Sequence, residues 1–263
     1  MNALRRHARR FVRHLWWIFL AVTGLFATRA VVPEAVLRSA AEGSGNFLQA
    51  FGSIYGVIVA FILYMVWQQH NDTQVAVERE AVTLGELFRT LGWFTSWPER
   101  DEVRRRLRAY SRVVPMLNGA KPETPEEDDK RLLDHSLNAF LGYVPLPHEE
   151  RLYAPAFDLF HDLNQVREHR LTVSRLHLPE GLRWFVFLGG AICVASVWLL
   201  WMERVDVQAL LTACMTWVIV AVAALILDLD DPYSGDFVVD WGRFNEAAAR
   251  MDALQCPSME PRA

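Results

Sequence analysis

Carboxylates gather directly after the last long apolar run of the sequence, in the segment DLDDPYSGD at residues 228–236. Carboxylate oxygens are hard ligands of the kind that calcium prefers. The segment lacks the regular spacing and the distal bidentate glutamate of an EF-hand loop, and a helix end followed by a turn explains much of the same pattern. Calcium is therefore the candidate cofactor, no other is expected, and its candidate ligands are Asp230, Asp231 and Asp236.

A second group of polar side chains follows the uncharged run at residues 47–67: Gln69, Asn71, Asp72 and Glu80. We expect them to line a water-filled vestibule below a membrane span. Acids that face an anion pathway repel anions, so Asp72 and Glu80 must either pair with arginines or favour cations. The candidate partners are Arg79, Arg167, Arg170 and Arg175. The sign of the ion stays open at this point.

The uncharged run itself carries an apolar stripe at steps of four, three and four residues, made by Ile54, Ile58, Phe61 and Met65. Residues at these steps share one face of a helix. Rings of apolar side chains gate some channels by dewetting, so the stripe is a candidate pore lining. The alternative is that the stripe packs against neighbouring helices. Gly52 and Gly56 stand at GxxxG spacing, which permits close helix contact in membranes.

Catalytic chemistry has little support in this sequence. It contains no GxSxG, P-loop, HExxH or glycine-rich dinucleotide motif, and its eight histidines are scattered. The cysteines Cys193, Cys214 and Cys256 form no CxxC pair and are expected to be free thiols. A formal charge of −4, without a basic stripe, argues against nucleic acid as a partner. We therefore expect no enzyme.

Four apolar segments must position these residues: 15–32, 47–67, 184–202 and 207–227. About 20 helical residues cross a hydrocarbon core of about 30 Å. Several tryptophans stand at the ends of these segments, as in the aromatic belts of membrane proteins. The first segment, which Arg29 interrupts, is either a cleaved secretory signal or a retained span from which Arg29 reaches outward, and we favour a retained span. The sequence thus predicts an all-α protein with four spans.

The orientation follows from the positive charges. Residues 1–14 carry five arginines and no acid, which places the N-terminus in the cytoplasm. Residues 33–46 are then an external loop, and the short connection 203–206 is external too. With four spans, the region 68–183 and the segment 228–263 both lie in the cytoplasm. The expected location is the inner (plasma) membrane, with membrane lipids as neighbours.

The region 68–183 is predicted to be a helical domain. The second span continues into it as one long helix to residue 93, with an apolar stripe of Val77, Ala81, Leu84, Phe88 and Leu91. Further helices are expected at 99–116, 131–141, 149–176 and 241–251, with an acidic loop at 118–130. The arginine run at 104–108 is either a contact for anionic lipid or a solvated helix face, and we favour the second.

Several of these residues carry a resemblance to a known family. They are Gly52-x-x-Tyr55, Asn71-Asp72, Glu80-Ala81, Tyr110, Arg170 and Arg175 with Leu178-Pro179, and the segment DPYSGD at 231–236. In these positions the chain resembles the bestrophin-like family of prokaryotic membrane proteins, and more distantly the bestrophins. The resemblance covers residues 47–93 and 165–245.

Bestrophins have four spans, cytoplasmic termini and a cytoplasmic helical domain, and they assemble as pentamers around a chloride pathway lined by the second span. The resemblance therefore implies a homo-oligomeric, pentameric anion channel. It also implies calcium at the acids after the fourth span, although this chain has fewer acids there. The alternative function is a non-conducting membrane scaffold or sensor whose cytoplasmic helices bind a partner protein.

Overall fold

The computed structural model describes the backbone of residues 2–116, 125–234 and 236–255, and the side chains of 15–116, 130–234 and 236–254. The described residues form eight helices and contain no strand, so the predicted all-α class is confirmed. They divide into two compact units, which are described separately. Unit 1 comprises residues 1–68 and 177–230, and unit 2 comprises residues 69–176 and 231–263. The long helix α2 (Glu34–Leu91) contributes residues to both.

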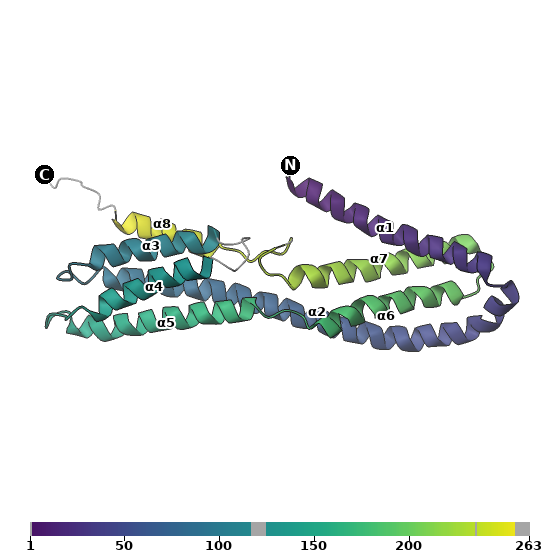
Figure 1. Cartoon of the computed structure of the whole chain (residues 1–263), viewed down its shortest axis with the longest axis horizontal. Helices are drawn as coiled ribbons and strands as arrows, with labels where there is room; N and C mark the ends of the chain where they lie inside the picture. The colour runs from purple at the N-terminus through teal and green to yellow at the C-terminus, as the bar shows by residue number, and fades with distance from the viewer. Residues whose placement is uncertain (1, 117–124, 235, 256–263) are drawn as a thin grey trace. The chain divides into compact units, whose positions relative to one another are not determined.

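Unit 1 contains α1 (Asn2–Val31), the first part of α2, α6 (Glu180–Leu199) and α7 (Val205–Leu229) (Figure 1). Three helices, α2, α6 and α7, are long and apolar enough to cross a bilayer, and α1 holds a shorter apolar stretch at Leu15–Val31. The chain is therefore a membrane protein with apolar helices. Trp16, Trp67 and Trp184 are exposed on these helices, as expected for side chains at a lipid interface.

Small residues let the helices of unit 1 approach closely. A Cβ atom on Gly24 of α1 would lie 2.5 Å from the Trp198 ring of α6, and a Cβ atom on Gly190 of α6 would lie 2.5 Å from Ile219 of α7. Neither position has room for a side chain. Such contacts matter in a membrane because lipid tails are as apolar as the helices, which removes the usual hydrophobic drive.

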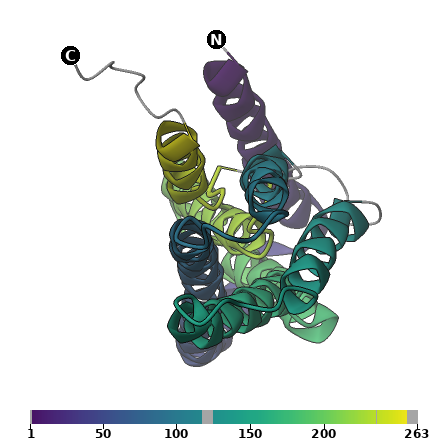
Figure 2. The ribbon, with the colours of Figure 1, turned by 90° about the vertical axis from the view of Figure 1, so that its left-hand side faces the viewer.

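Unit 2 contains the second part of α2, α3 (Arg100–Met116), α4 (Pro125–Leu141), α5 (Glu150–Ser174) and α8 (Gly242–Gln255) (Figure 2). Its core is large and aromatic, with Phe88, Phe94, Phe140 and Phe244 fully buried. The predicted stripe of α2 in this unit is confirmed, since every member is at most 2% exposed: Val77, Ala81, Leu84, Phe88 and Leu91.

Two predicted loops are wrong. Residues 34–46 are the first turns of α2, and Pro33 stands immediately before them, where its fixed φ suits a helix start. The small residues of this stretch suggested a loop, but they allow it to pack on α6: Ser44 donates a hydrogen bond to the Leu199 carbonyl. The acidic segment 118–130 is helical from Pro125 onward, because proline and acids are both favourable in a first helical turn. Residues 118–124 lie outside the described part of the chain.

Candidate functional site on the long helix

The first part of α2 has one covered face and one uncovered face. Tyr55, Val59, Ile62 and Val66 are buried and pack in a cluster with residues of α6 and α7. The uncovered side carries large apolar side chains, each more than two-fifths exposed and none charged: Ile54, Val57, Phe61, Tyr64 and Met65. This unit therefore leaves a wide apolar face of α2 for lipid, another subunit or a pore.

The predicted pore-lining residues do not all share that face. Ile54, Phe61 and Met65 are 62%, 63% and 43% exposed, whereas Ile58 is half-buried and packs against the core of unit 1. Val57, which the stripe omitted, is 72% exposed. The difference arises because an apolar helix offers several stripes at the same spacing, and only the packing of α6 and α7 selects the uncovered one.

Tyr55 fixes the covered face. Its hydroxyl donates a hydrogen bond of 2.7 Å to the Val186 carbonyl of α6, and its ring lies against Gly189, where a Cβ atom would come within 2.5 Å. A buried hydroxyl needs such a partner, because leaving it unbonded in an apolar medium is costly. Tyr55 thereby sets the rotation of α2 and decides which residues remain uncovered.

The four predicted vestibule residues are divided between different surroundings within unit 2. Asn71 and Asp72 are exposed. Gln69 is half-buried and donates a hydrogen bond from its side-chain amide to the Leu176 carbonyl. Glu80 is fully buried in the chain, so it does not face water from this unit. Its placement in a vestibule wall is therefore corrected.

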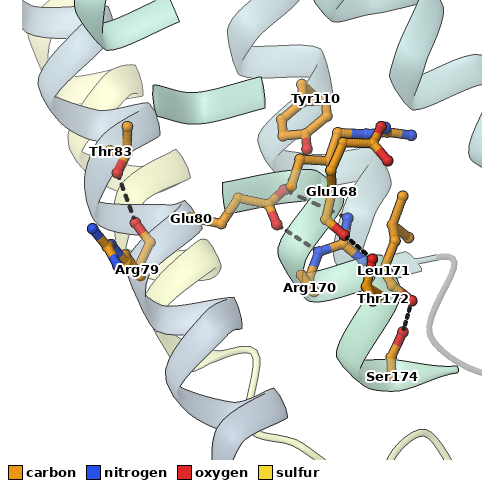
Figure 3. A network of polar contacts seen from close by, with 10 residues as sticks. Arg79, Glu80, Thr83, Tyr110, Glu168, Arg170, Leu171, Thr172 and Ser174 are labelled. Atoms are coloured by element: carbon orange, nitrogen blue, oxygen red, sulfur yellow. Dashed lines mark hydrogen bonds and ion pairs between the residues drawn. The ribbon is translucent and has the colours of Figure 1, made fainter. Parts of the chain in front are cut away.

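Glu80 forms a buried network with Arg170 of α5 and Tyr110 of α3 (Figure 3). The Arg170 Nε donates to Oε2 at 2.5 Å and its Nη2 to Oε1 at 3.5 Å, while the Tyr110 hydroxyl donates to Oε1. The Arg170 guanidinium also lies 6.0 Å from the Trp241 ring centre. The arginine pairing left open by the sequence is thus the arrangement found, with Arg170 as the partner.

Burial alone would lower the pKa of Arg170, but the adjacent Glu80 carboxylate outweighs burial and holds that pKa well above its usual range. The Arg170 guanidinium therefore stays charged inside unit 2. Of the other candidate partners, Arg79 is exposed and lies away from the network (Figure 3). Arg167 is buried and donates to Glu168 at 2.9 Å. The network joins α2, α3 and α5 within unit 2.

The acidic segment after α7 also serves the fold. Asp230 is 4% exposed, and its two carboxylate oxygens accept from the Leu178 amide at 2.6 Å and from Arg183 at 2.8 Å. Asp231 accepts from the Tyr233 amide and the Ser234 hydroxyl, which closes a turn, and Asp236 is exposed. Within the described residues, no three histidines, cysteines or acids come together as a metal site. Calcium binding stays a prediction.

Residues 15–242 match the family model of the bestrophin-like domain. The chain belongs to the bestrophin-like family. Its fold is similar to that of a bacterial bestrophin homologue from Klebsiella pneumoniae, with 12% identity, a TM-score of 0.68, and coverage of 91% of this chain and 97% of that chain. A point mutant of that homologue gives 11% identity, a TM-score of 0.70, and coverage of 93% and 97%. A comparison with curated proteins finds no match.

The residues that carried the family resemblance are mostly anchors in this bestrophin-like chain. Tyr55 ties α2 to α6, and Glu80 ties α2 to Tyr110 and Arg170. The amide of Leu178, in the pair Leu178-Pro179, donates a hydrogen bond to the Asp230 carboxylate. These residues therefore hold helices in place rather than presenting a reactive surface.

Two anchoring residues escaped the sequence analysis. Arg29 looked like a charge that reaches outward from the first span, yet it bonds to Gln208 of α7 at 2.6 Å. Glu149 is 1% exposed and accepts from the Thr95 and Ser96 amides and from the Tyr143 hydroxyl. A charge inside an apolar run was a signal for Arg29, whereas nothing in the spacing of PLPHEE distinguishes Glu149 from its neighbours.

Proposed function

We propose that this bestrophin-like protein is an ion channel of the inner membrane, formed by several copies of the chain with α2 lining the pathway. The observation that carries the proposal is the uncovered, uncharged face of α2 with Ile54, Phe61 and Met65, opposite a face that α6 and α7 bury. One chain with so few apolar helices cannot enclose a pore, so a ring of copies is required. The bestrophin resemblance suggests five.

Four spans complete the proposed architecture. Three helices satisfy the length and composition of a span, and α1 supplies the fourth through Leu15–Val31. These 17 residues extend about 26 Å, slightly less than the hydrocarbon core of about 30 Å. Both termini, and unit 2 with them, are then cytoplasmic by the positive-inside rule.

The burial of Glu80 removes one objection to an anion pathway. Glu80 is buried and neutralised by Arg170, so it adds no carboxylate to a water-filled wall. Asp72 is the exposed acid among the predicted vestibule residues. The selectivity for chloride that we propose rests otherwise on the resemblance to bestrophins.

Reconstituted protein in planar bilayers tests this function. We expect unitary currents whose reversal potential in a KCl gradient lies toward the chloride equilibrium potential. Phe61→Ala should raise the conductance, because it widens an apolar constriction. Leu210→Ala, on an exposed face of α7, is the matched control and should leave the current unchanged. Silence from a verified oligomer would contradict the channel and favour a scaffold.

A further inference from the structure

Three segments meet at one end of unit 1: the end of α1, the start of α2 and the connection between α6 and α7 (Figure 1). That connection carries Trp201. The guanidinium carbon of Arg29 lies 4.7 Å from the centre of the indole ring, and that of Arg38 lies 5.1 Å from it. Each distance is within the range of a cation–π contact. Two positive charges are therefore held beside one aromatic ring.

Arg29 is held in place by neutral groups. Its Nε and Nη2 donate to the Gln208 Oε1 at 3.0 and 2.6 Å, and Nη2 also donates to the Met202 carbonyl at 2.5 Å. Gln208 is fully buried and is itself oriented by its bonds to the carbonyls of Val197 and Leu200. The charge of the half-buried Arg29 is thus balanced by no carboxylate of the described chain, and its Nη1 remains available for a ligand.

Two acids at this end of unit 1, Glu34 and Asp206, form ion pairs with arginines other than Arg29. Glu34 lies 2.6 Å from the Nη2 of Arg38, and both side chains are about three-fifths exposed. Asp206 pairs with Arg204 at 2.5 Å, and that pair is exposed too. Exposed pairs of this kind are weak, so the contact with Glu34 does not commit Arg38 to a single partner. Arg29 and Arg38 together therefore offer donors to an anion beside Trp201.

The anion that fits is a phosphate group at the membrane surface. Guanidinium groups bind phosphate through paired hydrogen bonds, and a tryptophan at the end of apolar helices lies at headgroup level. We propose that Arg29, Arg38 and Trp201 form a binding site for the phosphate of a phospholipid headgroup. With the membrane orientation proposed above, this site lies in the outer leaflet. The proposal does not depend on ion conduction.

Native mass spectrometry of the delipidated full chain in detergent tests the site. The probes are phosphatidylglycerol, the diacylglycerol with the same acyl chains, and inorganic phosphate. We expect phosphatidylglycerol to bind and diacylglycerol to bind at least about ten-fold more weakly, since charged hydrogen bonds are lost. Arg38→Gln should weaken phosphatidylglycerol binding several-fold and Arg29→Gln/Arg38→Gln at least about ten-fold. Arg204→Gln, at the same end of the unit, should not alter it.

Arg38→Gln keeps the proposal falsifiable if the double variant fails to fold, because Arg38 makes none of the bonds that orient Gln208. Equal binding of phosphatidylglycerol to the wild type and to Arg38→Gln would overturn the site. Equal binding of diacylglycerol and phosphatidylglycerol would overturn the role of phosphate. If inorganic phosphate bound as tightly as the lipid, the site would be one for a free anion, and the assignment to lipid would fail.

Discussion

The two parts of α2 are buried by different chemistry. In unit 1, Tyr55 places its ring on Gly189 and its hydroxyl on a backbone carbonyl, without any charged group. In unit 2, Glu80 forms a fully buried ion pair with Arg170 inside a large aromatic core. Apolar helices in lipid associate through close packing and occasional hydrogen bonds, whereas a water-exposed domain gains from burying aromatic rings. The same helix therefore needs two kinds of anchor.

The largest loss of stability is expected where a substitution would leave a buried charge unpaired. Glu80→Gln should destabilise unit 2 by about 3–5 kcal/mol, because Arg170 then remains charged and buried without its carboxylate. Thermal unfolding of the purified protein measures the loss, and Glu78→Gln, on the same helix and less buried, is the control. Replacing both partners by Glu80→Met/Arg170→Met should recover much of the stability. A loss below about 1 kcal/mol for Glu80→Gln would show that the pair does not anchor α2.

A smaller effect is expected at the apolar anchor. Gly189→Ala would place a methyl group 2.5 Å from the Tyr55 ring, and overpacking of this kind costs about 1–3 kcal/mol. Gly181→Ala, near the start of the same helix α6, is the matched control, since a Cβ atom there meets nothing of the chain within 4 Å. Thermal stability in detergent compares the two variants. Equal stability of Gly189→Ala and wild type would mean that α2 and α6 are not in close contact.

Gly56 tests whether the uncovered face of α2 contacts another subunit. Because one chain leaves this glycine open, any close contact made there comes from another copy. Gly56→Leu is expected to disturb the assembly through GxxxG packing without unfolding the subunit. Light scattering after gel filtration should show a smaller particle of unchanged helical content. A particle of wild-type mass would remove Gly56 from the subunit interface.

The smallest predicted effect is a pH dependence in unit 2. Burial alone would raise the pKa of Glu149, but the hydrogen bonds from Tyr143, Ser96 and Thr95 outweigh it and lower the pKa. The stability from this carboxylate is present above its unfolded pKa of about 4.3 and is lost as the pH falls through the lower folded value. Glu149→Gln should therefore flatten the stability profile below about pH 4. If the pH dependence of stability at acid pH were the same in Glu149→Gln and the wild type, the role of Glu149 would be contradicted.

The positions of the helices could be predicted largely from apolar periodicity and from the lengths of uncharged runs. The stripe from Val77 to Leu91 is fully buried as expected, because apolar residues at a 3.6-residue period lie on one face of a helix whose other faces are polar. The face of α2 in unit 1 could not be predicted in the same way. All sides of that segment are apolar, so the glycines of α6, which lie far away in the sequence, decide which side is covered.

Long-range polar partners were also beyond the sequence. Glu80 had several candidate arginines, and nothing in their spacing favoured Arg170 over Arg167. Arg29 was understood as a charge that reaches outward, but Gln208 near the start of α7 holds it. The helix at residues 34–46 was missed because small residues indicate a loop by composition, whereas here they permit packing on α6.

The most direct test of the central claim, that α2 lines an ion pathway, is the accessibility of Phe61 to water. Phe61→Cys in a background with the three cysteines replaced by serine would be treated with a charged thiol reagent during bilayer recording. A side chain in the pathway predicts rapid modification that changes the unitary current, while Val59→Cys, on the buried face, should not react. A current that stays unchanged, with Phe61→Cys protected by lipid, would contradict the account.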